Sequence, residues 1–293
     1  MIAVRPRTVV ALVLASLSGL VAFGWPLLVD ASWSFEQGRN APIYFAGLLL
    51  AVLAVSMAEL ADGGLDARTV AMLGILSALG AAVRPLGAGT AGVETVFFLL
   101  VLSGRVFGPG FGFVLGNTAL LSSALLTGGV GPWLPYQMLA AAWVAAGAGL
   151  LPLRVRGRAE LAMLAAYGAL AGLLYGLALN LSFWPFTLGA DSSISFVPGD
   201  AVLENLRRLV VFSLTTSLGW DIGRAVTTAL LVVVAGPVVL RTLRRAARRA
   251  NFVARSGDDR DRGPEGEADV LDQHLDVLVH HPDAAVAHVG SDG

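Results

Sequence analysis

Ionisable residues within apolar stretches are the first candidates for chemistry, because a charge inside a membrane or a core is costly to bury. The chain has few, and most fall near the ends of apolar runs: Glu59, Arg84, Glu94, Arg105, Asp221 and Arg224. Cysteine is absent, and all four histidines lie beyond residue 270 in an acidic segment. An intramembrane hydrolase needs a buried base or metal ligands on rigid helices. The sequence therefore predicts no catalytic residue, no metal site and no cofactor.

The elements that must position these groups are membrane-spanning helices. Of all residues, 56% are hydrophobic and 14% are charged, whereas about a quarter are charged in an ordinary soluble domain. All 20 basic residues are Arg, so the chain lacks the Gly-Lys-Ser/Thr phosphate loop that binds ATP. We therefore expect an integral membrane protein that does not hydrolyse ATP by that route and has no nucleic-acid partner.

Eight apolar segments approach the length of about 20 residues that a membrane span requires. They are 8–29, 42–60, 69–84, 93–105, 107–126, 136–153, 159–182 and 206–241. Gly108-Pro109-Gly110 predicts a turn between the fourth and fifth segments, and residues 217–221 predict a break in the last. Arginines gather in alternate connections, so the positive-inside rule predicts two cytoplasmic termini. Residues 30–41, 85–92, 127–135 and 183–205 then face the outside.

The fold class that follows is an all-α polytopic membrane protein in three parts. Residues 1–60 form a two-helix N-terminal membrane extension, residues 61–254 a six-helix membrane core, and residues 255–293 a disordered acidic cytoplasmic tail. Charge marks the last boundary, since 17 Arg and 11 acidic residues precede it and 3 Arg and 10 acidic residues follow it. A tail with so few large apolar side chains cannot offset the entropy lost on folding.

Two of the apolar segments carry small residues at four-residue spacing, which permits another helix to approach closely. The first segment has Ala11, Ala15 and Gly19, and the third has Gly74, Ala78 and Ala82. Such a face serves either packing within the chain or docking on another membrane protein. The spacing does not separate these two uses.

Longer strings are more specific than this spacing. They are RPLGAGTAGVET at 84–95, GRVFGPGFGFVLG at 104–116, TGGVGPWLPYQML at 127–139, LNLSFWPF at 179–186, FVPG at 196–199 and GWDIGRA at 219–225. With them, most of residues 69–250 resembles the substrate-binding S component of energy-coupling factor (ECF) transporters, of an actinobacterial type. The resemblance implies a six-helix core over 69–250, preceded by two extra N-terminal transmembrane helices. It also implies capture of a vitamin or similar micronutrient at the extracellular face, without chemical change.

The same resemblance implies partners and a location. A membrane-embedded coupling (T) subunit would dock on Gly74, Ala78 and Ala82, and two cytoplasmic ABC-type ATPases would supply the energy. The protein would then reside in the plasma membrane of a bacterium. Members that carry nickel or cobalt have a His directly after the initiator Met, whereas Ile2 stands here. A metal ion is therefore not the expected cargo.

The residues themselves favour an organic ligand, because aromatic faces stack and a few polar groups orient a bound molecule. The candidates on or near the predicted outer segments are Arg84, Glu94, Asn117, Trp133, Tyr136, Gln137, Asn180 and Trp184. The aromatic residues also fit an interfacial belt, Arg84 and Glu94 fit a surface ion pair, and Asn117 fits a hydrogen bond between helices.

On the predicted cytoplasmic side, five arginines within Arg241–Arg249 share one helical face that should meet anionic lipids. An intramembrane enzyme, or a scaffold that recruits a cytoplasmic partner through its tail, remains the alternative function.

Overall fold

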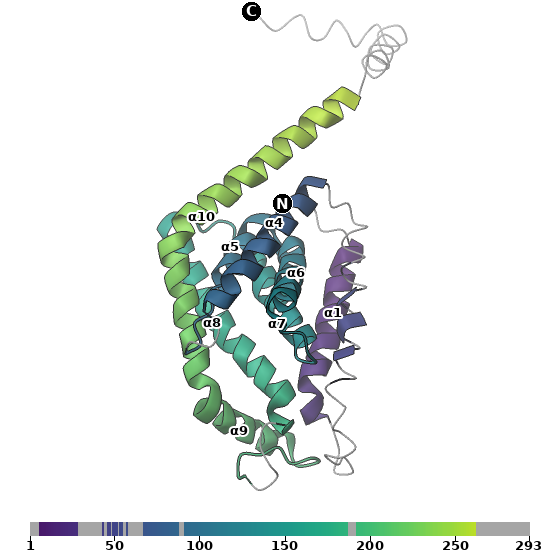
Figure 1. The fold of residues 1–293 in the computed structure, drawn as a ribbon, viewed down its shortest axis with the longest axis vertical. Helices are drawn as coiled ribbons and strands as arrows, with labels where there is room; N and C mark the ends of the chain where they lie inside the picture. The colour runs from purple at the N-terminus through teal and green to yellow at the C-terminus, as the bar shows by residue number, and fades with distance from the viewer. Residues whose placement is uncertain are drawn as a thin grey trace, which may run out of the picture. The chain divides into compact units, whose positions relative to one another are not determined.

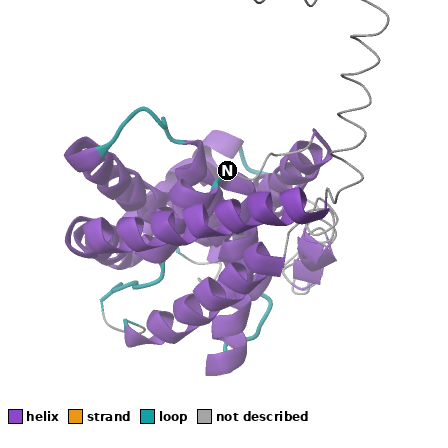
Figure 2. Ribbon diagram, turned by 90° about the horizontal axis from the view of Figure 1, so that it is seen from above, coloured by secondary structure: helices purple, strands orange, loops and turns teal. Residues whose placement is uncertain are grey.

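The computed structural model describes residues 6–28, 67–87, 91–186 and 192–261, with isolated helical positions between residues 43 and 57. These residues form helices joined by loops, and no strand occurs among them (Figure 2). The helices are α1 (Pro6–Gly24), α4 (Ala67–Val83), α5 (Phe97–Phe107), α6 (Pro109–Thr127), α7 (Leu134–Leu150), α8 (Gly157–Phe183), α9 (Val202–Phe212) and α10 (Leu218–Asp261). Most of the predicted span at 42–60, and the tail from residue 262, lie outside the described residues.

Four of the described helical stretches are long and apolar enough to cross a membrane. They are Ala67–Leu86, Pro109–Thr127, Gly157–Phe186 and Val202–Arg248. Large aliphatic side chains cover much of the surface, including Leu125 and Val234, each 68% exposed. In water such a surface would be unfavourable, whereas lipid accommodates it. The protein is therefore an all-α membrane protein.

The predicted turn between the fourth and fifth apolar segments is confirmed. Gly108 separates α5 from α6 and has a φ of 93°, a conformation that residues with a side chain rarely adopt. Pro109 follows as the first residue of α6, where its fixed φ suits a helix start and its missing N–H is not needed. The sequence order Gly-Pro therefore reverses the chain within one residue.

The most extensive contact between two helices joins α6 to α7, which lie side by side at the centre of Figure 1. A Cβ added at Gly116 would lie 2.5 Å from the Cα of Ala142, and one at Gly112 would lie 2.7 Å from the carbonyl carbon of Ala145. Neither position has room for a side chain, so the two backbones are in direct contact. This close approach explains why the string at 104–116 repeats glycine at four-residue spacing.

Helix α1 packs against α7 and α8. Its Phe23 ring lies 5.2 Å from the Tyr136 ring and 5.4 Å from the Trp143 ring. Ala15 is fully buried, and a Cβ at Gly19 would lie 2.1 Å from a methyl carbon of Leu139. Ala15 and Gly19 of the first segment therefore serve packing within the chain. The extension predicted at 1–60 has part of its first helix in the same buried cluster as α7.

Contacts between helix ends divide the bundle into a loop end and a basic end. At the loop end, Arg84 after α4 contacts Gln137 at the start of α7, and Trp25 after α1 contacts Ser182 near the end of α8. At the basic end, Arg105 of α5 bonds the carbonyl of Leu151 after α7. The described parts of 85–92, 127–135 and 183–205, which the arginine pattern placed on one side, thus lie at one end of the bundle, and 30–41 lies outside the described residues. Which end faces the cytoplasm stays a prediction.

The last apolar segment contains an irregular turn. After α9, residues Ser213–Ser217 form a π-helical turn, and α10 begins at Leu218. The break predicted at 217–221 therefore lies a few residues earlier and widens the helix rather than interrupting it. The first compact unit ends at Arg244 within α10, and the second, from Arg245, begins with the remainder of that helix.

Candidate functional site

Arg84 stands at the loop end, in the short 3-10 turn Arg84–Leu86 that continues α4. Its guanidinium reaches the hydroxyl of Ser123 and the side-chain oxygen of Gln137, both at 3.4 Å. Both partners are neutral, and Arg84 has no ion pair with any residue that the structure describes. The half-buried cation is therefore held in place but not neutralised by a contacting carboxylate.

The loop that follows Arg84 is pressed against α10. Ala91 and Gly92 both have positive φ, at 45° and 77°, and such a conformation is strained for alanine. A Cβ at Gly92 would lie 2.0 Å from the carbonyl oxygen of Trp220, and one at Gly223 would lie 2.0 Å from that of Ala91. Two glycines thus let the loop and the helix meet backbone to backbone. Strained backbone of this kind is typical of positions that a function requires.

Glu94 lies in this loop, half-buried and within the electrostatic field of both Arg84 and Arg224. Burial raises the pKa of Glu94 above its ordinary value of 4.5, while the two arginines act in the opposite direction. The structure therefore places two predicted site residues, Glu94 and Gln137, near a third, Arg84. It adds a second arginine that the sequence-based site did not include.

That arginine, Arg224 of α10, has a carboxylate and an aromatic ring beside it. Its Nη1 donates to Asp221 Oδ1 at 2.6 Å and to the Gly172 carbonyl at 3.2 Å, and its Cζ lies 5.1 Å from the centre of the Tyr175 ring. Its buried Nε has no hydrogen-bond partner among the described residues. A cation with an unused, directed donor is suited to bind a ligand oxygen.

Helix α8 approaches α10 closely enough to build this arrangement. A Cβ at Gly176 would lie 1.8 Å from Asp221 Oδ1, and one at Gly172 would lie 3.4 Å from Cγ of Arg224. The glycine repeat on α8 was a signal that could have located Arg224, because four-residue spacing marks a face open to another helix. The repeat does not identify the partner helix. Only the packing of α8 against α10 identifies it.

Tyr136 and Asn117 are buried, each with one polar atom that lacks a partner in the described part of the chain. The Tyr136 hydroxyl is such an atom, and its ring lies between Phe23 and Phe183, at 5.2 Å from each. Asn117 donates to the Phe113 carbonyl at 2.8 Å, while its Oδ1 has no partner. Asn117 thus bonds its own helix. No described hydrogen bond connects it to Arg84.

The remaining candidates do not converge on Arg84. Trp133 is 45% exposed and donates to the Gly129 carbonyl in its own loop. Trp184 is buried, donates to the Ile194 carbonyl at 2.8 Å and packs against Phe196. Asn180 donates to the Ser213 hydroxyl and accepts from the Ser217 hydroxyl, so it holds the π-helical turn. Trp184 and Asn180 therefore shape the loop end rather than presenting free groups.

The small-residue face of α4, unlike Ala15 and Gly19 of α1, is exposed, and the arginines of α10 differ in exposure. Gly74, Ala78 and Ala82 on α4 are exposed, and a Cβ at Gly74 would meet no described atom within 4 Å. In the Arg241–Arg249 group, Arg244 binds Glu160 at 2.6 Å. At least one of the five arginines is therefore already paired, while Arg241, Arg245 and Arg248 are exposed.

No protein-family model, curated protein or solved structure matches this chain. The functional assignment therefore depends on the site itself and on the resemblance of the sequence strings.

Proposed function

We propose that this chain is the substrate-capture subunit of an ATP-driven importer of the ECF type. It binds a vitamin or similar micronutrient at the extracellular face and releases it chemically unchanged. The observation that carries the proposal is the polar cluster at the loop end, defined as Arg84, Glu94, Gln137, Asp221 and Arg224. It holds an arginine without an ion pair and a buried arginine Nε without a partner among the described residues.

The architecture supports this proposal in a second way. Helices α4, α5, α6, α7, α8 and α10 overlap in sequence with the six segments that the resemblance implies as core helices, and α9 precedes the last of them. The polar cluster draws on the loop after α4 and on α7 and α10. A ligand bound there contacts several core helices at once, so its binding can change how they pack.

Coupling to a partner follows from the exposed face of α4. We propose that Gly74, Ala78 and Ala82 receive a membrane-embedded coupling subunit, to which two cytoplasmic ABC-type ATPases bind. Small residues support this role because they let a second helix approach along its whole length. The extracellular position of the polar cluster and the cytoplasmic position of both termini, in a bacterial plasma membrane, belong to the same proposal.

The test is native mass spectrometry of the purified full-length chain in lipid nanodiscs. A small molecule should copurify with the wild type, and Arg84→Gln should reduce its occupancy by about tenfold or more, the scale of one lost charged contact. Arg158→Gln is the matched control, because Arg158 is exposed at the basic end. Equal occupancy in the two variants, or chemical conversion of the bound molecule by the chain alone, would contradict the proposal.

A further inference from the structure

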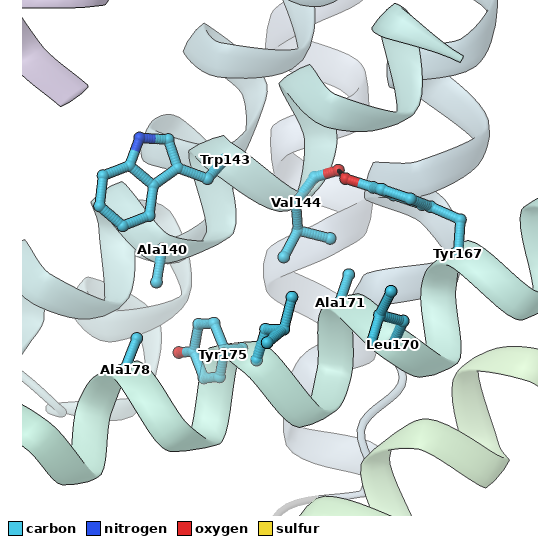
Figure 3. A pocket seen from close by; sticks show the side chains of 9 residues that line it. Ala140, Trp143, Val144, Tyr167, Leu170, Ala171, Tyr175 and Ala178 are labelled. Carbon is cyan, nitrogen blue, oxygen red and sulfur yellow. Dashed lines mark hydrogen bonds between the residues drawn. The ribbon is translucent and has the colours of Figure 1, made fainter. Parts of the chain in front are cut away.

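A pocket of about 200 Å³ lies between α7 and α8, in the middle of both helices (Figure 3). Trp143 and Val144 come from α7, and Tyr167, Leu170, Leu174 and Tyr175 come from α8. Ala140 lies between the rings of Trp143 and Tyr175. The small alanine side chains leave the space that the large rings enclose.

The lining of this pocket is mostly apolar, and two of its polar groups already have hydrogen-bond partners. Trp143 Nε1 donates to the Ser16 hydroxyl of α1 at 3.0 Å, and the Tyr167 hydroxyl donates to the Val144 carbonyl at 2.7 Å. Leu170 and Leu174 are more than half exposed, so one side of the pocket opens at the helix surface that lipid would contact. An uncharged, apolar group is the occupant that such walls favour.

Tyr175 connects the pocket with the polar cluster. Its side chain lines the pocket, and the Arg224 guanidinium lies 5.1 Å from the centre of its ring. Arg84, Glu94 and Arg224 all lie within electrostatic range of its hydroxyl. A molecule in the pocket therefore contacts the same aromatic side chain against which the Arg224 guanidinium is placed.

The pairing of charges in the polar cluster indicates the other half of such a molecule. Asp221 binds Arg224, whereas the contacts of Arg84 are the neutral Ser123 and Gln137. A group with negative charge would pair with Arg84 without displacing a described carboxylate from it. Guanidinium groups bind carboxylate and phosphate oxygens with two parallel hydrogen bonds.

We propose that the pocket between α7 and α8 is the apolar subsite of the captured molecule, whose anionic end binds at Arg84. The substrate class is then a small amphiphile with one ring or short alkyl chain, whose anionic end lies at the loop end and whose apolar part fills the pocket. An apolar cavity of about 150 Å³ admits benzene, so one ring fits the volume here. This inference rests on the proposed capture function and adds a substrate class to it.

The test is calorimetric titration of the full-length chain in nanodiscs with three probes, with empty nanodiscs subtracted. The probe 4-phenylbutyrate has both a ring and an anionic group, butyrate lacks the ring, and 4-phenyl-1-butanol lacks the charge. The combined probe should bind about tenfold more tightly than either partial probe, the scale of one well-fitted group. Ala178→Leu, which fills the pocket edge, should weaken its binding by a similar factor. Arg84→Gln should weaken the binding of 4-phenylbutyrate but not that of 4-phenyl-1-butanol.

Ala166→Leu is the matched control, since Ala166 is exposed on the same helix outside the pocket. Unchanged binding of 4-phenylbutyrate in Ala178→Leu, or no binding beyond empty nanodiscs, overturns the apolar subsite. A phospholipid bound at the pocket and lost in Ala178→Leu, in place of a small molecule, also overturns it and assigns the space to the bilayer. If the copurified molecule persists in Ala178→Leu but is lost in Arg84→Gln, the capture function stands and only the subsite is wrong.

Discussion

The Nε atom of Arg105 lies 2.7 Å from Oε1 of Glu160, and each side chain is only 2% exposed. Arg105 also donates to the carbonyls of Leu151, Pro152 and Val155, and Arg244 donates to the same Glu160 oxygen. One buried carboxylate thus joins α5, α8 and α10 at the basic end. The sequence places Arg105 near the end of an apolar run, and the structure gives it a structural role there.

Glu160→Ala should destabilise the protein strongly, because it leaves Arg105 buried without its counter-charge. Removing one member of a buried ion pair costs about 3–5 kcal/mol. Glu204→Ala is the control, since Glu204 and Arg207 are exposed and 4.0 Å apart, and such a pair contributes about 0–1 kcal/mol. Thermal unfolding in detergent measures the stability of both variants. Similar melting temperatures would show that the buried pair does not stabilise the fold.

Ala78→Trp should weaken assembly with the coupling subunit while leaving ligand binding intact. A bulky side chain on a close-packed face separates the two helices and removes their contacts along the seam. Leu79→Trp is the control, because Leu79 is also exposed on α4 and lies about 100° around the helix. Copurification of the tagged variants with the importer complex measures assembly. Loss of assembly in both variants, or in neither, would show that the coupling subunit does not dock on this face of α4.

Gly223→Ala should displace the loop at 91–96, because its Cβ would lie 2.0 Å from the carbonyl oxygen of Ala91. We expect reduced ligand occupancy, since Glu94 lies in this loop. Gly219→Ala, one turn earlier on α10, meets no described atom within 4 Å and should be neutral or slightly stabilising. Native mass spectrometry measures occupancy and circular dichroism measures helix content. If Gly223→Ala keeps full occupancy, the loop is not part of the binding site.

Glu94→Gln should stabilise the protein at neutral pH but not at about pH 4. Burial raises the pKa of Glu94 above 4.5, so ionised Glu94 is less favourable in the folded state than in the unfolded one. Folded stability is then greatest below 4.5 and decreases as the pH rises through the raised pKa, whereas Gln does not titrate. Melting temperatures at the two pH values measure the difference, with the exposed Glu204→Gln as control. An equal increase in melting temperature at both pH values would assign the stabilisation to packing rather than to the charge of Glu94.

Much of the fold follows from local sequence. The helix reversal at Gly108-Pro109 depends on two neighbouring residues and was predicted correctly. The grouping of Arg84 with Gln137 was also predicted, because both lie at helix ends that alternate connections bring to one end of a bundle. These features depend on chain order and on backbone preferences, which a sequence displays directly.

The sequence by itself determined a helical membrane protein, since its apolar segments cannot fold with their backbones unpaired in lipid. Only the tertiary structure decided how each helix is rotated about its axis. That rotation buries Ala15 and leaves Ala78 exposed, although both belong to small-residue faces with the same four-residue spacing. It also places Arg224 beside Tyr175, 49 residues away in sequence, and Arg105 against Glu160, 55 residues away. Side-chain contacts over such separations depend on the packing of whole helices, and no local pattern specifies that packing.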